Sequence, residues 1–422
     1  MTVSPHFTHR NGVLHAEQVS LAQLAAEHGT PLYVYSRAAL KEAWHSYQSA
    51  IKGRNVLVCF GMKANSNLAV LNEFRQWGAG FDIVSGGELA RVLAVGGDPS
   101  KIVFSGVGKQ AWEMQAALKA GVKCFNVESE AELDLLAQVA HEMGTVAPVS
   151  LRVNPDVDAK THPYISTGLK ENKFGIAIED ALAVYERARS YPSLRVVGLD
   201  CHIGSQITEL APYLDALNKL IALIKQLGSR GITLHHLDLG GGIGIRYTNE
   251  NPLSPTELVD NVFKTLEAHQ LDYLELVLEP GRSLVGNAGV LLTQVQYLKP
   301  GEVRNFAIVD AAMNDLIRPT LYDAWHDIEA VAPRSPQGDT PVYDIVGPIC
   351  ESGDWLARQR ALDLKAGDLL AIMSAGAYAF TMSSHYNTRP RAAEVMVDGE
   401  QTHVIRPRET LHDLFGSERV LA

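Results

Sequence analysis

The chain has 422 residues, 46% of them hydrophobic and 20% charged, so it can bury a large core and we expect two domains. The formal net charge is −11 and the basic residues are scattered, which argues against nucleic acid or an anionic membrane as a partner. No stretch is predicted to span a membrane, and residues 1–10 are polar with Pro5, so we expect no signal peptide there.

Four cysteines are present and fall in no paired spacing: Cys59, Cys124, Cys201 and Cys350. Three of them lie in apolar, strand-like runs. Reduced thiols in a cytoplasmic protein are therefore expected rather than disulfides.

Residues 12–35 predict a short strand, a helix over Leu21–His28 with Ser20 as N-cap, and an extended segment over Pro31–Tyr35. From Ser36 onward, apolar strand-like runs alternate with amphipathic helical stretches. The predicted strands are Val56–Phe60, Phe81–Val84, Ile102–Phe104, Cys124–Val127, Val149–Val153, Val196–Cys201, Leu234–Leu239 and Leu274–Leu278. The predicted helices include Leu68–Gln76, Glu88–Val95, Ala111–Ala120, Glu130–His141, Pro212–Leu227 and Pro255–His269. This alternation indicates an α/β fold, a closed (β/α)8 barrel of the TIM type in preference to an open doubly wound sheet.

After about Gly286 the pattern changes to β-branched runs separated by Gly, Pro and Asp, with few long helices. The runs are Gly289–Leu298, Asn305–Val309, Thr340–Val346, Leu369–Met373 and Ala393–Val397. They predict a mostly antiparallel β domain, a sandwich or barrel, which the extended N-terminal segment is free to join. We therefore expect a barrel domain at 36–285 and a β domain made of 1–35 and 286–422.

Lys63 follows the first barrel strand, so that an apolar run delivers one amine to the rim of the sheet. The ordinary outcome for such a lysine is a solvated surface position. A lysine held on a rigid element and partly desolvated is instead suited to form a Schiff base. The residues that follow the other strands favour this second interpretation.

In a barrel of this type, active residues follow the carboxyl ends of the strands, and a phosphate commonly binds the loops after strands seven and eight. Strand seven is followed by Gly240, Gly241 and Gly242, and strand eight by Glu279-Pro280-Gly281-Arg282. Glycines let main-chain N–H groups approach an anion closely, and Arg282 adds a cation. A tight turn is the alternative. A dinucleotide fingerprint is excluded, because Ile245 or Tyr247 stands where its last glycine is required.

Strand six leads into His202 and Ser205. A histidine there is a metal ligand, a base or a core residue. A metal site is disfavoured, because His141 has no second histidine at the spacing of a zinc helix, and the adjacent His235 and His236 point to opposite faces of a strand. We expect the flat ring of His202 to stack on a planar cofactor and Ser205 to donate to a phosphate.

An amine, an anion-binding loop, a planar side chain and the carboxylate of Glu279 thus converge. Pyridoxal 5′-phosphate requires that set: Lys63 bonds to its aldehyde, the glycines hold its phosphate, and a carboxylate keeps its pyridine nitrogen protonated.

The residues also resemble a known family. The chain is similar to the barrel-fold pyridoxal-phosphate decarboxylases, and among them to the bacterial meso-diaminopimelate decarboxylase family. The similar blocks are 60–65, 80–88, 201–206, 237–244, 279–282, 318–322, 350–354, 376–378 and 386–390. Departures are small: the family often has Tyr-Ala where this chain has Phe60-Gly61, and Asn where it has His385.

The resemblance implies Lys63 as the Schiff-base lysine, His202 stacked on the ring and Glu279 at the pyridine nitrogen. It also implies a catalytic thiol, Cys350, as proton donor, contributed by the partner subunit of a homodimer with shared active sites. The implied phosphate and cofactor contacts come from Ser205, Gly240, Gly241, Gly242, Gly281, Arg282 and Tyr378.

For the substrate, the resemblance implies a distal ammonium and carboxylate that need an anion and a cation on the protein. We expect Arg318 with Tyr322 to bind the carboxylate and Glu351 to pair with the ammonium, with Arg282 and Tyr378 near the substrate. Ornithine lacks the distal carboxylate, so an arginine facing it is left unpaired at a cost of roughly 1–3 kcal/mol. Taken singly, Arg318 and Glu351 are also explained as an ion pair and a solvated loop residue.

The activity this implies is decarboxylation of meso-2,6-diaminopimelate to L-lysine and CO2, the last step of lysine biosynthesis. A decarboxylase of ornithine, arginine or a carboxylated polyamine is the nearest alternative. An alanine racemase is disfavoured, since Glu279 stands where that family has an arginine. A catalytically silent protein that binds pyridoxal phosphate is the remaining alternative.

Overall fold

The computed structural model describes residues 4–158, 162, 167–168, 172–334 and 340–421. The chain forms two compact units. The barrel unit consists of residues 44–245 and 251–283, and the β unit of residues 1–43, 246–250 and 284–422. The domain bounds expected from the sequence, 36–285 with two flanking segments, stay a prediction.

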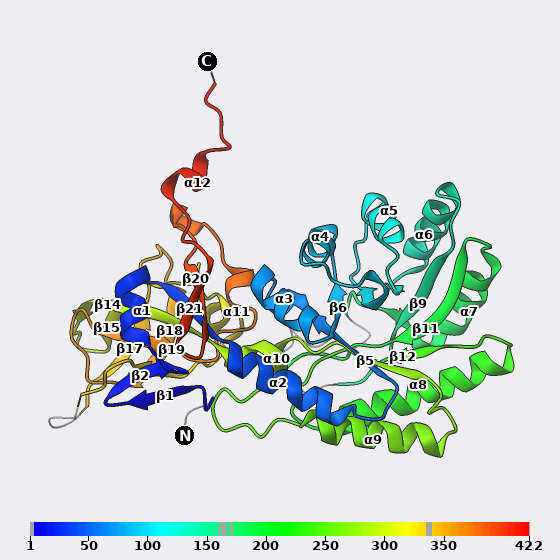
Figure 1. Ribbon diagram of the computed structural model, residues 1–422, viewed down its shortest axis with the longest axis horizontal. Coiled ribbons are helices and arrows are strands. Elements are labelled where there is room, and N and C mark those ends of the chain that lie inside the picture. The colour runs from blue at the N-terminus through cyan, green and yellow to red at the C-terminus, as the bar shows by residue number, and fades with distance from the viewer. Residues whose placement is uncertain (1–3, 159–161, 163–166, 169–171, 335–339, 422) are drawn as a thin grey trace. The chain divides into compact units, whose positions relative to one another are not determined.

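In the described part of the barrel unit, eight parallel strands close on themselves, with helices on the outside (Figure 1). Closure is made by β13, which pairs in parallel with β5, and the short β10 pairs with the end of β9. The predicted (β/α)8 barrel is therefore confirmed. Its eight strands are β5 (Val56–Gly61), β6 (Gly80–Ile83), β7 (Ile102–Phe104), β8 (Cys124–Val127), β9 (Ala147–Asn154), β11 (Leu194–Asp200), β12 (His236–Asp238) and β13 (Glu275–Leu278), and β10 (Ile176–Ala177) is the additional short strand.

The predicted helices of this region are present, with bounds close to those expected, and α2 and α7 are additional to them. Most of them start at a side chain that accepts a main-chain N–H, as Asn67, Ser85, Ser129 and Ser254 do. The helices are α2 (Arg37–Ala50), α3 (Leu68–Gln76), α4 (Gly86–Ala94), α5 (Ala111–Ala120), α6 (Glu130–Glu142), α7 (Ile178–Ser190), α8 (Ala211–Ser229) and α9 (Pro255–Ala268).

His236 illustrates how the barrel wall accommodates a polar ring. It is buried while His235 is exposed, as expected for neighbours on a strand. The ring fits because residue 198 is glycine: a Cβ there would lie 2.0 Å from Nε2 of His236. Burial lowers the pKa of His236 to about 3, so it is a neutral core residue.

The β unit contains a sheet in the order β18-β17-β15-β14-β4-β20-β21, to which β19 adds beside β14 and β16 beside β19. Of its pairings, β15–β17 and β4–β20 are parallel and the others antiparallel, so the mostly antiparallel domain is confirmed. The strands are β4 (Leu32–Ser36), β14 (Gly289–Lys299), β15 (Asn305–Val309), β16 (Ile328–Ala330), β17 (Val342–Val346), β18 (Trp355–Ala361), β19 (Leu369–Ile372), β20 (Ala393–Asp398) and β21 (Gln401–Arg406).

The N-terminal segment is part of this unit. Strands β1 (Phe7–Arg10), β2 (Val13–Ala16) and β3 (Val19–Ser20) form a small sheet, and α1 (Leu21–His28) starts where the Ser20 hydroxyl accepts from the N–H of Gln23. Strand β4 then lies between β14 and β20 and is buried along its whole length. The extended segment therefore does join the β sheet, at its centre.

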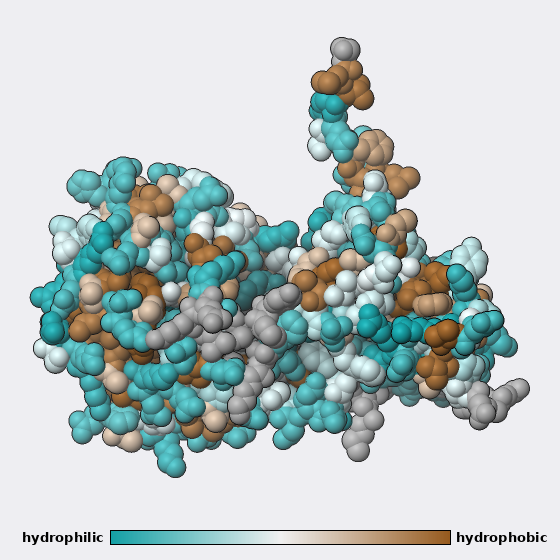
Figure 2. All heavy atoms as spheres, turned by 180° about the vertical axis from the view of Figure 1, so that it is seen from behind, coloured by the Kyte–Doolittle hydropathy of each residue, from teal (hydrophilic) through white to brown (hydrophobic). Residues whose placement is uncertain are grey.

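Short helices lie at α10 (Arg282–Val285), α11 (Arg318–Tyr322) and α12 (Leu411–Phe415), with 3-10 turns at Met62–Ala64, Pro99–Lys101, Gly286–Ala288, Phe380–Met382 and Tyr386–Thr388. From α12 onward the chain stands clear of the sheet and carries exposed apolar side chains, among them Leu411, Phe415 and Val420 (Figures 1 and 2). Among the described helices, none has both the length and the hydrophobicity needed to cross a membrane.

Candidate active site

Lys63 sits in the 3-10 turn directly after β5, at the carboxyl end of that strand. Its Nζ donates to Oδ2 of Asp82 over 2.8 Å, and Asp82 belongs to the neighbouring strand β6. The side chain of Asp82 is fully buried, whereas that of Lys63 is 35% exposed. The amine is therefore anchored by a buried carboxylate and still reaches solvent.

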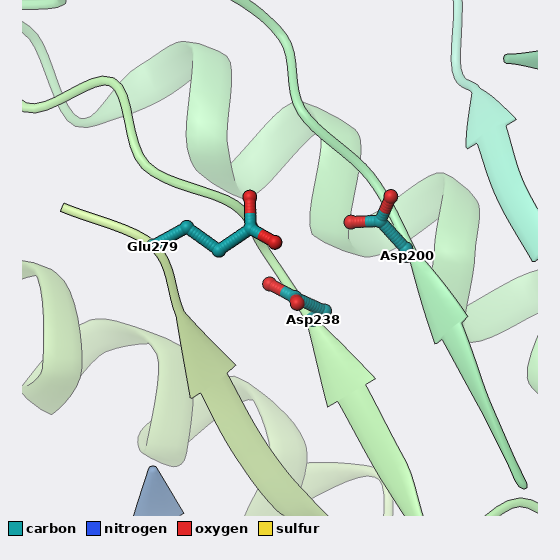
Figure 3. Close-up of side chains that lie close together, drawn as sticks. All are labelled: Asp200, Asp238 and Glu279. Atoms are coloured by element: carbon teal, nitrogen blue, oxygen red, sulfur yellow. The ribbon is translucent and has the colours of Figure 1, made fainter. Parts of the chain in front are cut away.

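Three buried carboxylates form a cluster at the same end of the barrel: Asp200 ends β11, Asp238 ends β12 and Glu279 follows β13 (Figure 3). One oxygen of each lies within 4.8 Å of the others. Burial, with the charge of Asp82, raises the pKa of Asp238 to about 7. Burial, with the charges of neighbouring carboxylates, raises the pKa values of Asp200 and Glu279 well above the ordinary range. Such a cluster holds protons at neutral pH, and a divalent cation would require these groups to lose them.

The His202 ring is held by the glycine loop. The N–H of Gly241 donates to Nδ1 of His202 over 3.2 Å. Nδ1 is thus an acceptor, so the neutral ring carries its proton on Nε2. Burial, with the positive charges of Lys63 and Arg152, lowers the pKa of His202 well below its ordinary value. The ring is therefore neutral and fixed in orientation.

Residues 240–242 need glycine for reasons of packing. A Cβ at Gly240 would lie 2.6 Å from Nδ1 of His202, and one at Gly241 would lie 2.2 Å from the carbonyl oxygen of Glu279. Gly240 and Gly242 have φ of +67° and +104°, in the region that favours glycine. The N–H of Gly240 donates to Oδ1 of Asp238 over 2.8 Å. The first two amides of this loop thus already serve Asp238 and His202.

Ser205 and Arg282 are paired. Nε and Nη2 of Arg282 donate to the Ser205 hydroxyl over 3.3 and 3.0 Å, and Arg282 is buried. A buried guanidinium beside a hydroxyl is suited to an anionic group.

The two departures from the family pattern have identifiable surroundings. The N–H of Gly61 donates to the carbonyl of Pro280, and a Cβ at Gly61 would lie 3.3 Å from the carbonyl oxygen of Glu279. Glycine there lets the end of β5 approach the Glu279–Gly281 segment closely. His385 is exposed and lies 2.7 Å from Oε2 of Glu409 through its Nε2.

Five predicted site residues belong to the β unit. Cys350 is exposed, and its N–H donates to Oδ1 of Asn387 over 3.0 Å. Glu351 is also exposed and accepts a short hydrogen bond from the Tyr386 hydroxyl. Cys350 and Glu351 thus both contact the 386–387 segment.

The other three lie on separate segments of that unit. Arg318 is buried at the start of α11, and its Nη1 lies 2.7 Å from Nε2 of His326. Tyr322 ends the same helix and is partly buried. Tyr378 is partly buried with φ of +54°, a strained conformation for a residue with a side chain.

Several polar residues beside these sites were not among the predicted ones, namely Asp200, Asp238, Tyr247 and His326. The two aspartates had a usable signal, because each is a carboxylate in an otherwise apolar strand, shortly before His202 or Gly240. Tyr247 and His326 had no such signal. Tyr247 is distant in the sequence from Arg318, and His326, although only eight residues from Arg318, lies in no predicted strand or motif.

Known proteins are similar to this chain over nearly its whole length. Residues 37–286 match the family described as "Pyridoxal-dependent decarboxylase, pyridoxal binding domain". The diaminopimelate decarboxylase of Pseudomonas aeruginosa is 59% identical over 415 residues, which are 98% of this chain and 99% of that protein. A crystal structure of the Helicobacter pylori enzyme complexed with L-lysine has a TM-score of 0.89 at 43% identity, covering 94% of this chain and 98% of that one. One from M. jannaschii in co-complex with L-lysine has a TM-score of 0.94 at 37% identity and covers 100% and 99%.

Fold, site and matches together define a decarboxylase that depends on pyridoxal phosphate. The residues present fit that cofactor. The amine of Lys63 reaches solvent at the barrel rim, buried carboxylates that include Glu279 can pair with a pyridine nitrogen, and the glycine loop lies beside the neutral ring of His202. Within this class, the chain belongs to the diaminopimelate decarboxylase family.

Proposed function

We propose that the protein removes CO2 from meso-2,6-diaminopimelate to give L-lysine, the last step of lysine biosynthesis. The observation that carries this proposal is the convergence of Lys63, Glu279 and His202 at the carboxyl end of one barrel, in a chain whose relatives are diaminopimelate decarboxylases. Two of the related crystal structures hold L-lysine, which supports lysine as the product.

In this proposal the barrel residues bind and orient the cofactor. Lys63 would carry it, His202 would lie against its ring and Glu279 would face its pyridine nitrogen. When bound, pyridoxal phosphate accepts the electron pair that CO2 leaves behind. The Ser205 hydroxyl, Arg282 and the main chain of Gly242 and Gly281 hold the phosphate, together with Tyr378. Gly240 and Gly241 shape the loop, because their amides are engaged with Asp238 and His202.

The residues of the β unit recognise the substrate and complete the reaction. Arg318 with Tyr322 binds the distal carboxylate, Glu351 binds the distal ammonium, and Arg282 and Tyr378 lie near the substrate. Cys350 protonates the carbon from which CO2 has left, and its exposed position supports such a role. We further propose a homodimer in which Cys350 of each subunit serves the barrel of the other.

We propose a cytoplasmic location as well. Its support is that all four cysteines are free thiols and that Cys59, Cys124 and Cys201 are buried.

The test is a comparison of substrates and one variant. CO2 release should be rapid with meso-2,6-diaminopimelate and weak with ornithine, arginine and lysine, because these lack the distal carboxylate. Lys63→Ala should lose both turnover and the visible absorbance of the cofactor linked to the lysine. A preference for ornithine or arginine would replace the proposed substrate, and a Lys63→Ala protein that keeps the absorbance would remove Lys63 from its role.

A further inference from the structure

His326 is a buried residue of the β unit that lies just before β16 and contacts two groups through its two ring nitrogens. Nε2 lies 2.7 Å from Nη1 of Arg318, and Nδ1 lies 2.8 Å from the carbonyl oxygen of Met373. Both His326 and Arg318 are buried.

These two contacts define the protonation of the ring. A carbonyl oxygen only accepts a hydrogen bond, so Nδ1 of His326 must carry a hydrogen. A guanidinium only donates, so Nε2 must offer its lone pair to Arg318. If Nε2 also carried a hydrogen, its N–H would face the N–H of Arg318 and no hydrogen bond could form. His326 is therefore the neutral Nδ1–H tautomer as long as this contact stands.

A neutral acceptor has a particular consequence for Arg318. An aspartate or glutamate in this position would orient the guanidinium but would also neutralise it and compete with an incoming carboxylate. His326 orients Nη1 without adding a negative charge. We propose that His326 is a positioning residue, which aims Arg318 at the distal carboxylate of the substrate through a contact that adds no negative charge of its own.

The surroundings of the pair fix its geometry. The guanidinium of Arg318 lies over the ring of Tyr247, 4.7 Å from its centroid, and the His326 ring meets the same tyrosine edge-on at 5.4 Å. Nη2 of Arg360 donates to the main-chain carbonyl of His326 over 2.8 Å. The N–H of Met373 donates to the carbonyl of Asp327 over 2.8 Å. His326 is thus held on a strand-anchored segment, and Arg318 contacts both rings.

This inference rests on the proposed function, and a set of three variants in the holoenzyme tests it. His326→Ala removes the acceptor, so KM for meso-2,6-diaminopimelate should rise on the order of 10-fold to 100-fold while kcat changes little, because the contact is remote from the bond that breaks. His326→Gln can still offer a neutral oxygen and should recover much of the affinity. His326→Glu should bind at least as weakly as His326→Ala, because its carboxylate neutralises Arg318.

The matched control is His15→Ala. His15 is a partly buried histidine of the same unit whose Nδ1 lies 2.9 Å from the carbonyl of Val13, which is a main-chain group and not an arginine. His15→Ala should leave KM unchanged.

A merely structural role for His326 would lower the unfolding midpoint, the cofactor absorbance and kcat in all three variants, with no advantage for Gln over Glu, and would overturn the inference.

Failure of the proposed function looks different, since the unmodified enzyme itself would then not act on meso-2,6-diaminopimelate. The inference is still decided by ligand binding, read from the cofactor spectrum. Binding of L-lysine, which keeps the carboxylate, should weaken in His326→Ala, whereas binding of 1,5-diaminopentane, which has none, should not. Equal effects on both ligands, or none on either, would overturn it.

Discussion

Glu279 is buried beside two other carboxylates, Asp200 and Asp238, and this decides how the barrel end responds to pH. Burial is the largest cause of its raised pKa, followed by the charges of Asp238, Asp82 and Asp200, while Lys63 acts in the opposite direction. Groups this close cannot all ionise, because repulsion is strong where water is excluded. We infer that the cluster shares protons near neutral pH and that a positively charged ring nitrogen would draw Glu279 into its ionised form.

Asp238→Asn is the variant that tests this cluster. The pKa of Asp238 is raised from 3.8 to about 7 by burial first and then by the Asp82 charge, so the native state holds a proton between these values that the unfolded chain has lost. Stability of the cofactor-free protein should therefore fall as pH rises from about 4 to 7, by up to about 1.4 kcal/mol per pH unit for one proton. Asparagine cannot ionise, so the variant should show a shallower fall, measured by denaturant unfolding at a series of pH values.

Asp272→Asn is the control for that experiment, because Asp272 is an exposed carboxylate of the same unit. Its pH dependence should match that of the unmodified protein. If Asp238→Asn keeps the steep fall, Asp238 is already ionised in the native state and the proton-sharing cluster is wrong.

Among individual residues, the sequence identifies side chains that directly follow predicted strands. It misses side chains whose role depends on a tertiary contact. Lys63, His202 and Glu279 are predicted because each follows a predicted strand at the carboxyl end of a barrel. His326 could not be found this way. Its chemistry depends on Arg318, eight residues away, and on the carbonyl of Met373, 47 residues away, which only the folded sheet brings to its ring.

Among the elements, β4 has an unusual position. This five-residue strand from the N-terminal segment lies at the centre of a sheet that is otherwise made by the C-terminal third of the chain. Leu32 pairs with Leu292 of β14 on one side and Ala393 of β20 on the other. The loss of β4 would leave two strand edges unpaired at once. The β unit therefore depends on a long-range contact that its own contiguous sequence cannot supply.

Leu32→Ala should accordingly destabilise the protein by about 2–5 kcal/mol, since it opens a cavity in a packed core. Leu32 is fully buried in the cluster that includes Val34, Val290 and Val395. The comparison variant is Leu411→Ala in α12, whose side chain is 67% exposed and whose removal should change stability by less than about 0.5 kcal/mol. The midpoints of thermal unfolding of the two variants measure this difference, and equal midpoints would show that β4 does not support the fold.

Elements with a clear hydrophobic pattern or a capping residue are predicted well, and elements without them are not. Strand β7 and helices α3 and α5 have the predicted bounds. Helix α7 was not predicted, since its N-cap residue, Ala177, has no side chain that can cap the helix. Strand β18 was not predicted either, because Trp355–Ala361 carries two arginines and a glutamine and is not a continuous apolar run. Both are stabilised by neighbours rather than by their own pattern.

For the whole molecule, the proposed chemistry divides between the two units. The residues proposed to hold the cofactor lie mainly in the barrel unit, and Arg318, Tyr322, Cys350 and Glu351 lie in the β unit. A chain arranged in this way can complete its own site or that of a partner. With two-fold symmetry, a partner that lends its β-unit residues receives the same residues in return, so both sites of a dimer are completed together.

Mixed dimers decide between these arrangements. Lys63→Ala and Cys350→Ala chains, carrying different affinity tags and produced together, can be purified as the dimer that holds one of each. If the sites are shared, the intact Lys63 of one chain meets the intact Cys350 of the other at one of the two sites. The mixed dimer should then have about half the unmodified activity per dimer, although each parent dimer is nearly inactive. If each chain completes its own site, one site lacks the lysine and the other lacks the thiol, so the mixed dimer should be as inactive as its parents. A protein that sediments as a monomer while fully active would exclude sharing altogether.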